Sequence, residues 1–463
     1  LVWSAKDGSK TQLRDDAVIY GAMLVRAASP DESVAGDPSD RGLPGGHFDL
    51  DVFDEPGSTR EIYHEHQYDD DYDVTGVDLL SPVGCKRNGG LCWHQVMAGE
   101  SGVIVAGPTE DAHRLGPAVR RFAAATGLPL LADPLSGARF GFDDGALAVA
   151  GYDLFLRDEG VRERLAPGFI LRVGASPTSA ALQRWLFQHA SAVQVVIDDG
   201  PRWKDHGGTA TTYLMADAAD ALERLTRAWP SGSGSTSEAS APARGAWTLA
   251  DSAARAALGR RVDKELGEGG VAASVLRALP EGAALFVSSS MPIRDVDAFS
   301  LPSAERVEVL ASRGASGIDG VVSTAFGIAS QHDGPAALLI GDVALFHDQN
   351  GLLWSREPDA SLVIVLVDND GGAIFGMLPI AEHEPDFTTY FTTPHGIDLS
   401  RAAASHGVRC DDVPIEGVEA AVRAAIASGE TRLVQVKTDG AEGHRLRAET
   451  RDAVIERVLE ALA

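Results

Sequence analysis

Two short stretches of the sequence carry oxygen donors that could hold a divalent cation. Asp342 follows the apolar run 336–340, and Asn369 and Gly371 follow the apolar run 362–367. A carboxylate, an amide oxygen and a backbone carbonyl at a glycine turn are hard donors. Mg²⁺ binds such donors and completes its shell with phosphate oxygens. A Gly-Asp pair alone is more typical of an ordinary turn, but an Asn followed by glycines after the next strand favours a cation–phosphate site.

The elements around these donors form a βαβ pattern. Two apolar runs separated by a helix-length segment are typical of buried parallel strands joined by a crossover. Both donor groups then fall at the carboxyl ends of neighbouring strands, where open α/β sheets bind their ligands.

Four motifs of the sequence resemble a known enzyme family. Asp342 with Asn369 and Gly371 is similar to the metal-diphosphate motif of thiamine diphosphate enzymes. Within that superfamily, four stretches resemble the 2-succinyl-5-enolpyruvyl-6-hydroxy-3-cyclohexene-1-carboxylate synthases of menaquinone biosynthesis. They are SSSMPIRD (288–295), SRGASGIDG (312–320), HDQNGLL (347–353) and GGAIFGMLP (371–379). The resemblance extends from about Ser101 to the C-terminus.

The resemblance implies roles for particular residues. Asp342, Asn369 and Gly371 would hold Mg²⁺ or Mn²⁺ and, through it, thiamine diphosphate. Ile374 and Phe375 would face the thiazolium ring of the cofactor, although apolar side chains of this kind could equally be core residues. Leu378 would face the substrate in the same way.

Two arginines are candidates for binding substrate carboxylates. Arg294 and Arg313 follow predicted strands at 284–288 and 307–310 and so belong to the same sheet edge as Asp342. An arginine presents a planar fork that holds a carboxylate in two hydrogen bonds. A single arginine is more often a surface ion-pair partner, but the two together, with the resemblance, indicate a carboxylate clamp. A weaker candidate for this pocket is Ser290.

The chemistry that the resemblance implies uses 2-oxoglutarate and isochorismate. The thiamine carbanion adds to 2-oxoglutarate, CO₂ leaves, and the succinyl-semialdehyde unit is added to isochorismate. The resemblance also implies a homodimer or homotetramer, and an N-terminal pyrimidine-binding domain with a catalytic glutamate. No stretch of residues 1–100 resembles that domain, and the first residue is not Met. Two alternatives therefore stay open: a truncated or split enzyme completed by a separate pyrimidine-binding polypeptide, and a non-catalytic diphosphate-binding protein.

Alternating strand and helix patterns predict an α/β fold with parallel sheets. We expect a central Rossmann-like domain at 99–230, a Gly/Ser-rich linker at 231–245 and a diphosphate-binding domain at 246–463. Residues 1–98 are rich in Asp, Gly and Pro and have no assigned fold, and we expect them to be disordered or a remnant of a domain. In the central domain, Ser179 or Thr178 could bind a phosphate but is more typical of a helix cap.

Composition restricts the partners and the compartment. The chain has 463 residues and a net charge of −27, which argues against nucleic-acid binding. A dense acidic surface is typical of proteins that work in high salt, because salt screens the repulsion. No apolar stretch reaches the roughly 20 residues of a membrane span, so we expect no membrane anchor. The three cysteines form no CxxC pair, and with no leader sequence they indicate the cytoplasm.

Overall fold

The structure is a computed structural model that describes residues 102–141, 146–199, 204–229, 241–261 and 263–463. Of the region before residue 99, it describes three short strands: β1 (Val2–Ser4), β2 (Lys10–Gln12) and β3 (Met23–Arg26). β1 and β2 pair with each other in antiparallel fashion. The rest of the unassigned N-terminal region lies outside the described residues. The resemblance implies a catalytic glutamate in that region.

The first large sheet has the strand order β3-β8-β7-β6-β4-β5 and is parallel except for β3, which runs antiparallel to β8. This confirms the predicted parallel α/β arrangement. Its other strands are β4 (Gly102–Ala106), β5 (Leu130–Ala132), β6 (Phe169–Val173), β7 (Val193–Ile197) and β8 (Thr212–Met215). The helices of this domain are α5 (Ala112–Thr126), α6 (Tyr152–Phe155), α7 (Glu159–Arg164), α8 (Ala180–Gln188) and α9 (Ala218–Ala228). A 3₁₀ turn, η3 (Pro134–Ser136), follows β5.

Local sequence explains where these helices begin and end. α5 ends at Gly127, whose φ of 71° is left-handed, as expected for a glycine C-cap. Ser179 caps α8 by accepting a hydrogen bond from the Leu182 N–H at 3.1 Å. The capping interpretation of this segment is therefore confirmed. Alternate residues of the strands face α5 and α9 on one side of the sheet and α6 and α8 on the other.

The segment between the two sheets is more helical than predicted. α10 (Ala241–Gly259) begins inside the linker expected at 231–245. The chain then breaks into α11 (Asp263–Leu266) and α12 (Glu268–Ala278), because Gly267 adopts a φ of 58°.

The second large sheet has the order β10-β9-β11-β12-β14-β13 and is entirely parallel. Helices α12, α13 and α17 cover one face and α14, α15 and α16 the other. The strands are β9 (Ala284–Val287), β10 (Glu308–Leu310), β11 (Ala336–Gly341), β12 (Leu362–Asp368), β13 (Arg409–Asp412) and β14 (Arg432–Lys437). The helices after α12 are α13 (Met291–Phe299), α14 (Val321–Gln331), α15 (Asp342–His347), α16 (Leu399–Ser405), α17 (Val418–Ser428) and α18 (Gly440–Ala461).

Several shorter helices complete the second domain. The 3₁₀ helices are η4 (Gln349–Arg356), η5 (Ala373–Met377), η6 (Pro379–Glu382) and η8 (Ile415–Gly417), and η7 (Thr388–Thr392) is a π-helix. The crossover between β11 and β12 is therefore the short α15 followed by η4, rather than one continuous helix. Among the described residues, no helix is long and apolar enough to cross a membrane.

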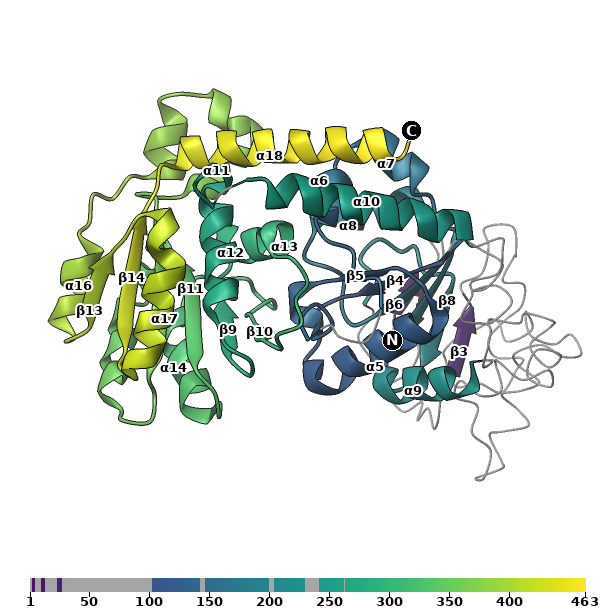
Figure 1. Cartoon of the computed structure of the whole chain (residues 1–463), viewed down its shortest axis with the longest axis horizontal. Coiled ribbons are helices and arrows are strands. Elements are labelled where there is room, and N and C mark those ends of the chain that lie inside the picture. Colours follow the sequence, from purple (N-terminus) through teal and green to yellow (C-terminus); the bar gives the residue numbers. More distant parts are fainter. Residues whose placement is uncertain are drawn as a thin grey trace, which may run out of the picture.

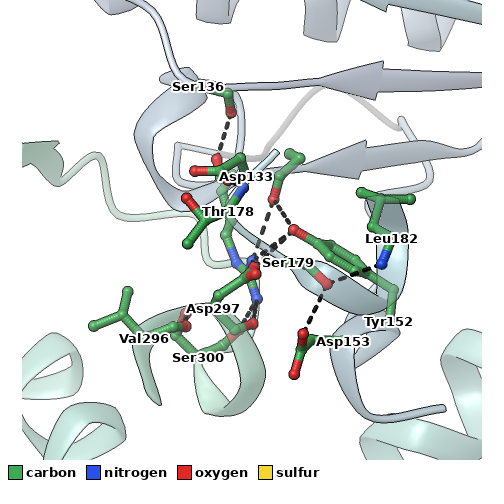
Figure 2. A network of polar contacts seen from close by, with 12 residues as sticks. Asp133, Ser136, Tyr152, Asp153, Thr178, Ser179, Leu182, Val296, Asp297 and Ser300 are labelled. Carbon is green, nitrogen blue, oxygen red and sulfur yellow. Dashed lines mark hydrogen bonds and ion pairs between the residues drawn. The ribbon is translucent and has the colours of Figure 1, made fainter. Parts of the chain in front are cut away.

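Two features join the sheet domains. The C-terminal helix α18 lies along both of them (Figure 1), and its Val454 and Val458 pack into the core beside the first sheet. Below it, the fully buried Arg139 of the first domain contacts Asp297 of α13 at 2.7 Å, and the Tyr152 hydroxyl donates to the same carboxylate oxygen at 2.7 Å. Figure 2 shows Tyr152 and Asp297 facing each other in this network.

Candidate active site

The two halves of the donor motif meet at one edge of the second sheet. β11 and β12 are neighbouring parallel strands, with Gly341 opposite Val367. Asp342 begins α15 directly after β11 and is buried. Asn369 follows the last residue of β12, as the sequence predicted.

The Asp342 carboxylate binds the backbone of the second motif. Its Oδ2 accepts hydrogen bonds from the N–H groups of Asn369 at 3.1 Å and Gly371 at 2.9 Å. Its Oδ1 accepts one from the Val343 N–H at 2.7 Å. Burial raises the pKa of this carboxyl above its ordinary value, against the lowering effect of these N–H donors. A bound cation would favour the ionised form that a ligand requires.

The side chain of Asn369 is also arranged as a ligand would be. Its Nδ2 donates to Oε1 of Glu268 at 2.8 Å, and the same Oε1 accepts from the Thr438 hydroxyl at 2.9 Å. The amide is therefore held by its nitrogen, while its Oδ1 is buried without a hydrogen-bond partner in the described part of the chain. A buried acceptor without a partner is costly unless something binds it, and a hard cation fits that requirement.

Gly371 makes the turn that brings these groups together. Its φ is 147°, and a Cβ on it would lie 2.2 Å from the carbonyl oxygen of Thr392. Only glycine fits this position. The donor set of carboxylate, amide oxygen and glycine-turn backbone thus agrees with the preferences of Mg²⁺ or Mn²⁺.

A cavity of about 170 Å³ lies beside the donors. Its lining includes Asp342, Asn369 and four other predicted site residues: Ser290, Gly371, Ile374 and Phe375. Leu378 does not line it and is 49% exposed. η5 carries Ile374 and Phe375 and contacts α18. In this contact, His444 Nε2 lies 2.5 Å from the Ala373 carbonyl oxygen.

The two predicted clamp arginines lie near each other, outside the cavity lining. Arg294 projects from α13 and donates to the Ser290 carbonyl at 2.6 Å. Burial and, next, the positive charge of Arg313 lower its pKa. Neither arginine forms an ion pair within the described ranges. A pair of like charges without carboxylate partners is suited to an anionic ligand.

Several site residues were missed by the sequence analysis. Glu268 comes from α12, about a hundred residues before Asn369, and Asp295 of α13 also lines the cavity. Asp295 is paired with the buried Arg447 of α18, whose pKa is lowered by burial to about 10. His395 lies beside Asp342. Asp295 ends the SSSMPIRD motif (288–295), but its type alone gave it no role, and Glu268, Arg447 and His395 stand in none of the quoted motifs, so no local signal marks them.

Comparison with known proteins indicates the family of the chain. Residues 92–287 match the family described as "Middle domain of thiamine pyrophosphate". This match and the two parallel-sheet domains place the chain in the family of thiamine diphosphate enzymes.

Three curated proteins make the assignment more specific, and each is named 2-succinyl-5-enolpyruvyl-6-hydroxy-3-cyclohexene-1-carboxylate synthase. The protein from Halobacterium salinarum is 43% identical over 76% of this chain and 59% of the relative. The protein from Geobacillus kaustophilus is 40% identical over 76% of this chain and 60% of the relative. The protein from Halorubrum lacusprofundi is 38% identical over 78% of this chain and 62% of the relative. The chain belongs to this synthase family, and it spans about three fifths of the length of these relatives.

Proposed function

We propose that the chain binds thiamine diphosphate through Mg²⁺ or Mn²⁺ and acts as a transferase of menaquinone biosynthesis in the cytoplasm. It would decarboxylate 2-oxoglutarate and add the succinyl-semialdehyde unit to isochorismate. The observation that carries the proposal is the buried, partnerless Oδ1 of Asn369 next to the Asp342 carboxylate at the cavity. The names of the relatives give the product, and the family resemblance implies the two substrates.

The residues of the chain would share the work as follows. Asp342 and Asn369 supply side-chain ligands and Gly371 a backbone carbonyl, so that the cation anchors the diphosphate. Ile374 and Phe375 form an apolar wall that limits water at the reacting ring. When bound, the cofactor supplies the carbanion chemistry that the protein side chains lack.

Arg294 and Arg313 would hold substrate carboxylates, with Ser290 and Leu378 completing the substrate pocket. Arg294 is half-buried on a helix packed into the core, so its position is well defined. A charge-assisted pair with a carboxylate is stronger than a neutral hydrogen bond. Substitution of either arginine should therefore raise KM for a substrate without weakening cofactor binding.

An exposed apolar surface beside the cavity supports a protein partner. Phe375, Met377, Leu378 and Tyr390 are 37%, 42%, 49% and 72% exposed and belong to one segment of the chain. Contiguous exposed apolar side chains mark interaction sites. We propose that this surface is covered by another copy of the chain in a homodimer or homotetramer. The alternative is that a separate pyrimidine-binding polypeptide covers it. Sedimentation of the wild type and of Tyr390→Asp distinguishes these from a monomer.

The proposed function is tested by turnover in high salt. The purified chain receives thiamine diphosphate, Mg²⁺, 2-oxoglutarate and isochorismate, and the loss of isochorismate is followed. We expect turnover that requires all four additions, and a raised KM in Arg294→Ala and Arg313→Ala but not in the exposed control Arg121→Ala. Saturable cofactor binding without turnover, alone or with a pyrimidine-binding polypeptide, would instead support a non-catalytic binding role.

A further inference from the structure

His395 lies at the donor motif although no sequence pattern points to it. Its Nε2 is 3.3 Å from Oδ2 of Asp342, and its side chain is only 12% exposed. This approach is an ion-pair distance rather than a hydrogen bond, and the Nε2 atom has no hydrogen-bond partner among the described residues. A buried ring nitrogen aimed at a predicted metal ligand requires an explanation.

The ring of His395 is fixed in one orientation. The N–H of Ile397 donates to its Nδ1 at 3.0 Å. Nδ1 is thus an acceptor, so the neutral ring carries its hydrogen on Nε2, which faces Asp342. The ring also stacks on Phe346, with centroids 6.4 Å apart and planes inclined by 19°. Phe346 is one helical turn after Asp342 on α15.

The backbone around His395 is attached to the other half of the motif. Oδ1 of Asp370 accepts hydrogen bonds from the N–H groups of His395 at 3.1 Å and Gly396 at 2.7 Å. The Gly372 N–H donates to the Thr392 carbonyl at 2.7 Å. The segment 392–396 therefore contacts the turn after β12 through its backbone and the residue after β11 through the histidine ring.

We propose that His395 is a positioning residue of the cation site. In the cation-bound site its Nε2–H would donate to Oδ2 of Asp342 and, with the N–H groups of Asn369 and Gly371, keep that oxygen turned toward the backbone. Oδ1, which accepts only from Val343, is then the oxygen left for a cation. This inference rests on the proposed function and adds to it a residue that orients the ligand. Hydrogen bonds of this kind to metal-bound carboxylates tune metal affinity.

The test measures affinity rather than activity. The chain is titrated calorimetrically in high-salt buffer with the complex of Mn²⁺ and thiamine diphosphate. His395→Ala and the better-filling His395→Met remove the donor, while His395→Gln retains one. The matched control is His406→Ala at the end of α16, which does not line the cavity. Thermal unfolding of each variant is recorded alongside.

We expect about tenfold or greater loss of affinity in His395→Ala and His395→Met. His395→Gln should recover most of it, with little change in the unfolding midpoint. Wild-type affinity in the Ala and Met variants would overturn this inference but not the proposed function. A loss of affinity in the Gln variant equal to that in the Ala variant would do the same. No Mn²⁺-dependent binding by the wild type would overturn the proposed function together with it.

Discussion

Nη1 of Arg139 lies 2.7 Å from Oδ1 of Asp297 in a fully buried contact between the two sheet domains. The guanidinium also donates to the carbonyls of Asp297 at 2.6 Å and Ser300 at 2.8 Å, at the C-terminal end of α13. The opposite end of that helix lines the cavity and carries Arg294. The first domain thus fixes the helix that supplies Arg294, one of the two arginines of the predicted substrate clamp.

Loss of one partner from this pair should destabilise the protein strongly. At a pH well above 7, where the Asp297 carboxyl is ionised, Arg139→Met leaves this carboxylate buried without its counter-charge, which typically costs about 3–5 kcal/mol of unfolding free energy. The measurement is urea unfolding in high salt. The matched control is Arg121→Met, whose ion pair with Glu223 is exposed and should contribute little. A loss in Arg139→Met as small as in the control would contradict the prediction.

The same carboxylate should make stability depend on pH. Burial raises the pKa of Asp297 to about 7, against the opposing charge of Arg139. The unfolded carboxyl titrates near 3.9, so the folded state retains a proton that the unfolded state releases. The contribution of this proton to the unfolding free energy is fully present below about pH 4 and is lost as the pH rises to about 7.

The measurement is the unfolding free energy of the wild type minus that of Asp297→Asn, taken across this pH range. Because the Asn side chain does not titrate, the subtraction isolates the one carboxyl. We expect the difference to fall with rising pH. A constant or rising difference would show that Asp297 is ionised throughout.

Gly371→Ala should abolish metal-dependent cofactor binding. The added Cβ would lie 2.2 Å from the Thr392 carbonyl oxygen, at a φ of 147°, so the turn must move. Gly327→Ala is the matched control, because its Cβ meets nothing within 4 Å and it lies inside α14. There alanine should be neutral or slightly stabilising. Calorimetric titration and thermal unfolding of both variants check the two expectations, and normal binding by Gly371→Ala would contradict the first.

Stability should increase with salt, because the net charge is −27. Screening shortens the Debye length from about 10 Å at 0.1 M to about 3 Å at 1 M. We expect the thermal midpoint to rise steeply at low KCl concentration and to level off well below 1 M. A midpoint that does not change between salt-free buffer and 1 M KCl would contradict adaptation to high salt.

The donor motif could be predicted because local signals mark it. Apolar runs interrupted by Gly-Asp and by an Asn with glycines identify both strand ends, and parallel pairing brings the ends together. α13 was missed, since no helix was predicted for the residues that follow the strand at 284–288. Pro292 in the first turn was an available helix-start signal.

The supporting residues could not be predicted in the same way. Glu268 and His395 reach the site only through tertiary packing of α12 and of the segment after η7. Arg139 contacts a residue 158 positions away. Such contacts depend on how the two domains pack, and no spacing in the sequence encodes them.

The central claim is that Asp342 and Asn369 bind the cation that anchors thiamine diphosphate. The most direct measurement is calorimetric binding of thiamine diphosphate with and without Mg²⁺, to the wild type and to Asp342→Ala, in high-salt buffer. We predict that Mg²⁺ strengthens binding to the wild type and has no effect on the variant. Tight Mg²⁺-dependent binding by Asp342→Ala would contradict the assignment.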